Sequence, residues 1–132
     1  MGISTPRVLI ADPDHDIRGS LEVYFKTNQY EVQTVETAAD ALKTGRHWQP
    51  NAILISDEFD NEDSHQVCRD LLGDTLTSHI PVIMLLHLNE RQARLEALEA
   101  GVNDIITKPF DIEELRLRVE AAIRLSTLRL ES

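Results

Sequence analysis

The segment Asp104-Ile105-Ile106-Thr107-Lys108-Pro109-Phe110 carries the clearest structural signal in this chain of 132 residues. Its apolar part has the composition of a short buried strand, and Asp111-Ile112-Glu113-Glu114 after it resembles the start of a helix. Strands that lead directly into helices are the units from which parallel sheets are built. Lys108 is therefore expected at the carboxyl end of a strand in an α/β domain.

Two other apolar segments also end in polar residues, namely Val8-Leu9-Ile10-Ala11-Asp12 and Ala52-Ile53-Leu54-Ile55-Ser56-Asp57. In an open parallel sheet, the carboxyl ends of the strands share one crevice, which is the usual ligand site. Two carboxylates and an ammonium there would suit a phosphoryl group and a divalent metal, because carboxylates bind Mg²⁺ and lysine neutralises phosphate. The plainer interpretation is that each is an ordinary polar residue at a strand end.

Strands and helices are expected to alternate along the whole chain. Short apolar runs predict strands, and apolar residues at helical spacing between capping and stop signals predict helices. Five such units imply a five-stranded parallel sheet with helices on both faces, formed by residues 7–125 as one domain. The predicted strands are 8–11, 30–35, 52–56, 82–86 and 105–107, and the predicted helices are 14–28, 37–45, one around 67–72, 89–100 and one from 111.

The ends of the chain are expected to lie outside this domain. Residues 1–6 are predicted to be an N-terminal extension. The apolar periodicity continues from Ile123 to Leu130, beyond what one sheet needs for cover. Residues 126–132 are therefore predicted to extend the last helix, as a coiled coil or a linker to an output domain, although a frayed helix end is an equal alternative.

Composition restricts the classes of partner. The net charge is −10 and the pI about 4.8, which argues against direct binding of nucleic acid through a basic face and favours protein partners. Cys68 is the only cysteine, so neither a disulfide framework nor a cysteine-rich zinc site is expected. No stretch approaches the roughly 18 apolar residues of a membrane helix. The expectation is a soluble cytoplasmic domain.

Five strings of the sequence together match the pattern of one known family. They are Val8-Leu9-Ile10-Ala11-Asp12, Ile17-Arg18, His79-Ile80-Pro81-Val82-Ile83-Met84-Leu85, Ala97-Leu98-Glu99-Ala100-Gly101 and Thr107-Lys108-Pro109-Phe110. With these strings, residues 7–125 resemble a response regulator receiver domain. The resemblance implies a flavodoxin-like, doubly wound sheet of strand order 2-1-3-4-5 and a signalling role without enzymatic turnover of its own. It also implies phosphorylation of an aspartate by a histidine kinase, Mg²⁺ as cofactor, a cis peptide before Pro109, and output or homodimer contacts through helix 4, strand 5 and helix 5.

The metal and acceptor positions depart from this family's pattern. Receivers usually have two adjacent acids after the first strand, but Pro13 follows Asp12 here, and Asp14 suits the N-cap of the next helix. Ungapped counting places Ser56 in the phosphoacceptor column, whereas Asp57 takes it only if an insertion is balanced by a deletion. The candidate metal ligands are therefore Asp12 and Asp57, the phosphate-binding residue is Lys108, and the acceptor is Ser56 or Asp57.

The positions that couple phosphorylation to output in receivers are also changed. Leu86 replaces the usual Thr or Ser after strand 4, and Ile105 replaces the usual aromatic residue of strand 5. Leu86 has no hydroxyl to donate, and a branched aliphatic side chain cannot make the aromatic swing. A surface fixed in one state fits these aliphatic residues better. His87 is a further candidate, because an imidazole with Asp12 and Asp57 would suit a transition metal.

Three functional hypotheses follow. The first is a degenerate receiver, or pseudo-receiver, that works through protein contacts in a two-component phosphorelay without aspartyl phosphorylation. The second is a phosphorylatable receiver that uses Asp57 with Mg²⁺ and Lys108. The third, a nucleotide- or flavin-binding protein on the same fold, is disfavoured because Asp12-Pro13-Asp14-His15 stands where a glycine-rich loop would be. Expected partners are a histidine kinase or another signalling protein.

Overall fold

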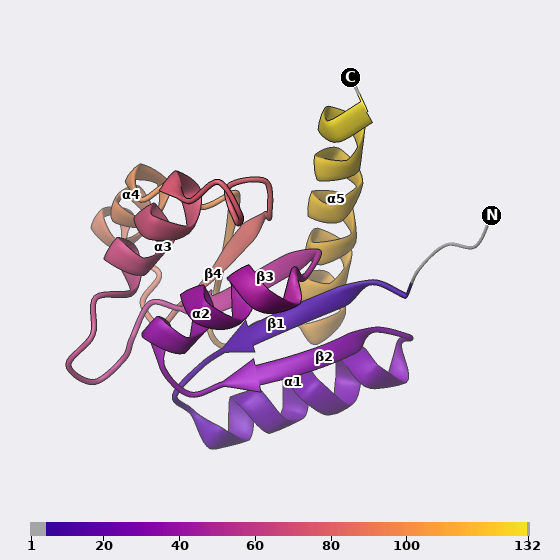
Figure 1. Cartoon of the computed structure of the whole chain (residues 1–132). Coiled ribbons are helices and arrows are strands. Elements are labelled where there is room, and N and C mark those ends of the chain that lie inside the picture. Colours follow the sequence, from indigo (N-terminus) through magenta and orange to yellow (C-terminus); the bar gives the residue numbers. More distant parts are fainter. Residues whose placement is uncertain (1–4, 132) are drawn as a thin grey trace.

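The computed structural model describes the backbone of residues 5–131 and the side chains of residues 5–128. In this part of the chain, strands and helices alternate, and the strands form one parallel sheet in the order β2-β1-β3-β4-β5 (Figure 1). The predicted fold class and strand order are confirmed. The strands are β1 (Arg7–Ala11), β2 (Glu31–Val35), β3 (Ala52–Ser56), β4 (Val82–Leu86) and β5 (Asp104–Thr107), and the helices are α1 (His15–Thr27), α2 (Ala38–Trp48), α3 (Ser64–Gly73), α4 (Arg91–Glu99) and α5 (Ile112–Glu131).

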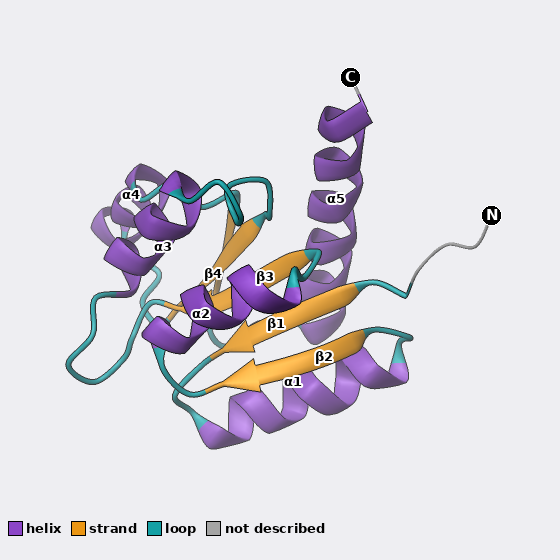
Figure 2. Ribbon diagram, in the orientation of Figure 1, coloured by secondary structure: helices purple, strands orange, loops and turns teal. Residues whose placement is uncertain are grey.

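The sheet is the middle of three layers (Figure 2). Side chains alternate along a strand, so Val8 and Ile10 of β1 join one core cluster while Leu9 and Ala11 join the other. The first cluster is completed by α1 and α5, and the second by α2, α3 and α4. Burial on both faces explains why the central strands are continuously apolar. It also leaves the strand ends as the edges at which polar groups can gather.

Capping side chains start the first two helices where the sequence predicts. The Asp14 carboxylate accepts hydrogen bonds from the backbone N–H groups of Asp16 and Ile17, which confirms its predicted role as the N-cap of α1. The Thr37 hydroxyl accepts from the N–H of Asp40 at 3.1 Å and starts α2.

The predicted end of α2 at Gly45 is wrong. The helix continues to Trp48 and closes at Gln49, whose φ of 54° is left-handed. Gly45 is instead a packing residue, because a β-carbon there would lie 3.5 Å from the Ile53 side chain and 3.6 Å from that of Leu71. The prediction treated Gly45 as a stop signal, whereas this glycine allows the helix to pack closely against its neighbours.

Helix α5 is longer than the sheet that it covers. Leu115 and Val119 are fully buried, and the helix continues without a break through residues 126–131, past the edge of the sheet (Figure 1). That segment is therefore helical where it is described, while the domain boundary at residue 125 stays a prediction. No helix in residues 5–131 combines the length and the apolar character needed to cross a membrane.

Candidate functional site

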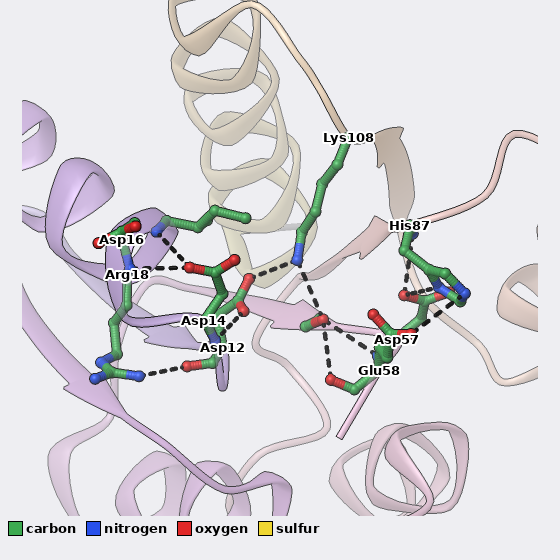
Figure 3. Close-up of polar contacts among 10 residues, drawn as sticks. Asp12, Asp14, Asp16, Arg18, Asp57, Glu58, His87 and Lys108 are labelled. Atoms are coloured by element: carbon green, nitrogen blue, oxygen red, sulfur yellow. Dashed lines mark hydrogen bonds and ion pairs between the residues drawn. The ribbon is translucent and has the colours of Figure 1, made fainter. Parts of the chain in front are cut away.

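The carboxyl ends of β1, β3 and β5 bring Asp12, Ser56 and Lys108 together. Figure 3 shows the Lys108 side chain reaching toward Asp12. The Lys108 Nζ lies 2.9 Å from Asp12 Oδ2 and 3.4 Å from Ser56 Oγ. Asp12 and Ser56 are fully buried, and the Lys108 side chain is 16% exposed. The peptide bond between Lys108 and Pro109 is cis, as the resemblance predicted. The centre of the crevice is thus a buried ion pair beside a neutral hydroxyl.

Asp12 is held at several atoms. Its Oδ1 accepts a hydrogen bond of 2.9 Å from the backbone N–H of Asp14, while Oδ2 accepts from Lys108. Its backbone carbonyl accepts at 2.8 Å from Nη1 of Arg18, which also pairs with Glu36. The sequence did not predict this contact of Arg18, which was noted only for its match to the receiver family. The sequence did hold one signal for it. Arg18 lies four residues after Asp14 on the predicted helix, so the two residues share a helix face, and Asp14 lies next to the end of β1.

Ser56 occupies the position in the crevice that faces the lysine. It is the last residue of β3 and pairs in register with Leu85 of β4. Its hydroxyl accepts a 3.2 Å hydrogen bond from the backbone N–H of Glu58 and lies 3.4 Å from the Glu58 carbonyl. The hydroxyl is thereby held between Lys108 and the start of the loop after β3.

Asp57 makes its contacts with the loop after β4. Its Oδ1 accepts from the backbone N–H of His87 at 3.1 Å, and its two carboxylate oxygens lie 2.9 and 3.0 Å from His87 Nδ1 (Figure 3). The Asp57 side chain is only 6% exposed, and Glu58 lies 3.6 Å from the other ring nitrogen of His87. Asp57 is therefore engaged with His87, while Ser56 faces Lys108.

The imidazole of His87 responds to these carboxylates. The hydrogen bond with Asp57 is the main cause that raises the pKa of His87, with further increases from the charges of Asp57 and Glu58. Partial burial and the positive charge of Lys108 act in the opposite direction. The cationic form of the imidazole is consequently favoured in the folded protein.

The residues present do not fit the Mg²⁺ site that the family implies. Mg²⁺ prefers carboxylate oxygens in octahedral geometry, but Asp12 is the carboxylate beside Lys108 and its two oxygens already accept hydrogen bonds. Pro13 offers no side-chain ligand, and Asp57 is paired with His87. Among residues 5–128, no group of three or more His, Cys, Asp or Glu side chains is placed to hold a metal ion. The combination of Asp12, Asp57 and His87 is therefore not assembled as a metal site, while the pair of Asp12 and Asp57 stays a prediction.

The two predicted switch positions lie in the apolar core. Leu86 is fully buried and Ile105 is 9% exposed, and both belong to the cluster covered by α2, α3 and α4. The backbone carbonyl of Leu86 accepts a 2.7 Å hydrogen bond from the N–H of Lys108. The end of β4 is thus tied to β5 through the backbone and offers no hydroxyl to the crevice.

A doubly wound sheet of this order, with an aspartate and a lysine at its carboxyl edge, defines a receiver-type α/β domain. Comparison with known families agrees with this class. The family model of the response regulator receiver domain matches residues 8–120, and the chain belongs to this family.

Relatives with known names are transcriptional and signalling regulators. The chain is 33% identical over 119 residues to the DNA-binding dual master transcriptional regulator RpaA of Synechocystis, covering 90% of this chain and 49% of RpaA. It is 34% identical over 123 residues to the transcriptional regulatory protein PrrA of Mycobacterium leprae, covering 93% of this chain and 52% of PrrA. The chain therefore spans about half the length of these curated relatives.

Solved structures support the same fold. The receiver domain of the Francisella response regulator 1452 matches with a TM-score of 0.84 and 27% identity, over 92% of this chain and 98% of that chain. A response regulator receiver domain protein from Methanospirillum hungatei matches with a TM-score of 0.88 over 96% of this chain and 99% of that chain. Because the sequence identity is 21%, this similarity supports the fold and carries no statement about function.

Proposed function

We propose that this receiver domain transmits signals through protein contacts without phosphorylation of an aspartate. One observation carries the proposal: the group that faces the Lys108 ammonium at the end of β3 is the buried hydroxyl of Ser56, at 3.4 Å, and not a carboxylate. The Asp57 carboxylate is paired with His87 instead. The domain is then a pseudo-receiver, which keeps the receiver fold and loses its chemistry.

The chemistry of the crevice supports this function. A serine hydroxyl attacks phosphorus well only when a base removes its proton, and the polar side chain beside Ser56 is a lysine ammonium, which donates. The Asp12 carboxylate is neutralised by the same lysine at 2.9 Å. Without a second acid at Pro13, the crevice has no set of ligands to position Mg²⁺ against a phosphodonor. The aliphatic Leu86 and Ile105 fit a surface that stays in one state.

The partners proposed for the domain follow from its relatives. RpaA is named as a DNA-binding regulator and is about twice as long as the matched region, so we propose that an output domain follows this receiver in the same polypeptide. The acidic charge of −10 makes the receiver itself unsuited to nucleic acid. A histidine kinase or another signalling protein is the proposed upstream partner, and α4, β5 and α5 form the proposed face for output or homodimer contacts. The proposed location is the cytoplasm.

A second candidate function is favoured by the similarity to named regulators such as PrrA. In that alternative the domain is phosphorylated on Asp57, with Mg²⁺ and Lys108 as cofactor and phosphate ligand. The Asp57 carboxylate would then have to leave His87 and turn toward the crevice. Phosphorylation would therefore require the loss of contacts that Asp57 makes here with both the backbone and the ring of His87.

Intact-mass measurement after incubation with acetyl phosphate and Mg²⁺ tests these two functions. We expect no phosphoryl adduct on the wild-type chain, under conditions that label a working receiver domain run in parallel. An adduct that disappears in Asp57→Asn and weakens in Lys108→Ala would overturn the pseudo-receiver and establish the second function.

Restored variants show which departure prevents labelling. Ser56→Asp provides a carboxylate opposite Lys108, and Pro13→Asp adds the missing second acid. We expect Ser56→Asp to be phosphorylated only if neither Pro13 nor Leu86 prevents phosphorylation by itself. Labelling of Pro13→Asp/Ser56→Asp, combined with an unlabelled wild type, would assign the loss of function to the acceptor and metal positions.

A further inference from the structure

We propose that the Asp57 and His87 contact is an internal clasp, which sets the loop after β4 and the start of α4 by means of the chain's own carboxylate. This inference rests on the proposed function, since it gives Asp57 a structural task in place of phosphorylation. The clasp joins the loop after β3 to residues 87–90, two segments that are separated by 30 residues in sequence.

Three contacts form the clasp. Asp57 Oδ1 accepts from the backbone N–H of His87 at 3.1 Å, and Nδ1 of the ring lies within 3.0 Å of both carboxylate oxygens. The backbone contact fixes the position of the loop, and the ring contacts fix the carboxylate itself. The Asp57 side chain is 6% exposed and that of His87 38%, so the carboxylate is shielded from water while the ring is partly open to it.

The segment on the far side of the clasp has little other attachment. Residues 87–92 are all exposed. Glu90 stands at the N-cap of α4 but makes no side-chain capping bond, and Ala97 is the one residue of α4 that is fully buried. A helix with so few buried residues depends on its flanking loops for its position. Among the described residues, the side-chain contacts that hold this loop to the body of the sheet are those of His87 with Asp57 and, at 3.6 Å, with Glu58.

The segment on the near side is firmly held, so it can act as the fixed half of the clasp. The backbone N–H of Asp57 donates to the Leu85 carbonyl at 3.0 Å. Further along the same loop, the Glu62 carboxylate accepts from the N–H groups of Ala38 and Ala39 at 2.8 and 3.0 Å, and Phe59 packs against the core. The loop after β3 is therefore anchored to β4 at one end and to α2 at the other, and Asp57 projects from a segment that is attached on both sides.

Amide hydrogen exchange on the full chain, without phosphodonor or added Mg²⁺, tests the clasp. Asp57→Ala removes the acceptor, and we expect exchange of the amides of residues 87–99 to accelerate about tenfold or more while the amides of β1 and β3 keep their protection. His87→Ala, which removes the ring but keeps the backbone N–H, should show a smaller change in the same amides. Asp60→Ala, an exposed residue of the same loop, is the matched control and should leave residues 87–99 unchanged.

Glu62→Ala provides a second control for the position of the effect. It should accelerate exchange at Ala38 and Ala39 and leave α4 protected, because its carboxylate caps α2. Equal exchange of residues 87–99 in wild type and Asp57→Ala would overturn the clasp, and so would an equal loss of protection across the whole sheet. An acetyl phosphate adduct on Asp57 would overturn only the proposed function, since the exchange is measured without a phosphodonor.

Discussion

At the end of β3, consecutive side chains point to opposite sides of the chain, and this alternation gives Ser56 and Asp57 different neighbours. Ser56 meets Lys108, whereas Asp57 meets His87. Ungapped counting anticipated this placement of Ser56, because both flanking segments agree on it. It did not anticipate the partner of Asp57, since His87 was considered only as a metal ligand. A contact between two loops 30 residues apart leaves no periodic signal in the sequence.

The buried ion pair of Asp12 and Lys108 yields the first prediction. Lys108→Met leaves a fully buried carboxylate without its cation, so we expect the free energy of unfolding to fall by about 3 kcal/mol. Urea denaturation measures the change. Lys26→Met removes an exposed pair with Glu22 and should cost less than about 0.5 kcal/mol. A Lys108→Met variant as stable as the wild type would show that the pair contributes nothing.

The raised pKa of His87 yields a prediction about pH. Protonated His87 binds Asp57 more strongly in the folded state, so its stabilisation is fully present below the ordinary pKa of 6.5 and is lost as pH rises through the raised value. The stability difference between wild type and His87→Gln should therefore shrink as pH rises from about 5 to 8.5. Thermal denaturation across this range measures it. A difference that grows with pH would contradict the assignment.

At the scale of the elements, apolar pattern and capping chemistry predicted most of the fold. The strand 52–56 and the strand 82–86 appear with the predicted bounds, because short, continuously apolar runs between polar loops are typical of strands buried on both faces. The end of α2 was missed, since a glycine that permits close packing and a glycine that ends a helix look alike in sequence. Their difference lies in tertiary neighbours, which at Gly45 are Ile53 and Leu71.

Gly101 follows the end of α4, where helix 89–100 was predicted to stop, and it gives a prediction for this helix. Its φ of 91° lies in the left-handed region, and a β-carbon there would lie 2.6 Å from Leu72 Cδ2. Gly101→Ala should lower the free energy of unfolding by about 1–2 kcal/mol or more. Gly19→Ala in α1 meets no atom within 4 Å and should instead stabilise by up to about 1 kcal/mol. Chemical denaturation of both variants checks the contrast, which a neutral Gly101→Ala would refute.

At the scale of the whole molecule, the two core clusters depend on residues before 125, which leads to a prediction about the domain boundary. Leu125 and Leu128 are more than half exposed, and Ser126 adds one hydrogen bond to the His79 carbonyl. A chain that ends at residue 125 should therefore fold with a loss of no more than about 1 kcal/mol. Circular dichroism and urea denaturation test this. A truncated chain that fails to fold would place the boundary beyond residue 125.

Helix α5 begins beside Lys108 and Phe110 at one edge of the sheet, and Ile123, Arg124 and Thr127 lie near the amino ends of β1 and β2 at the other. With 20 residues, it is a rod about 30 Å long. A segment joined after residue 131 would leave from the edge opposite the Ser56 crevice. Any tilt or rotation of the first turn of α5 would therefore displace that segment. The helix is continuous, so no loop between the two would absorb the movement.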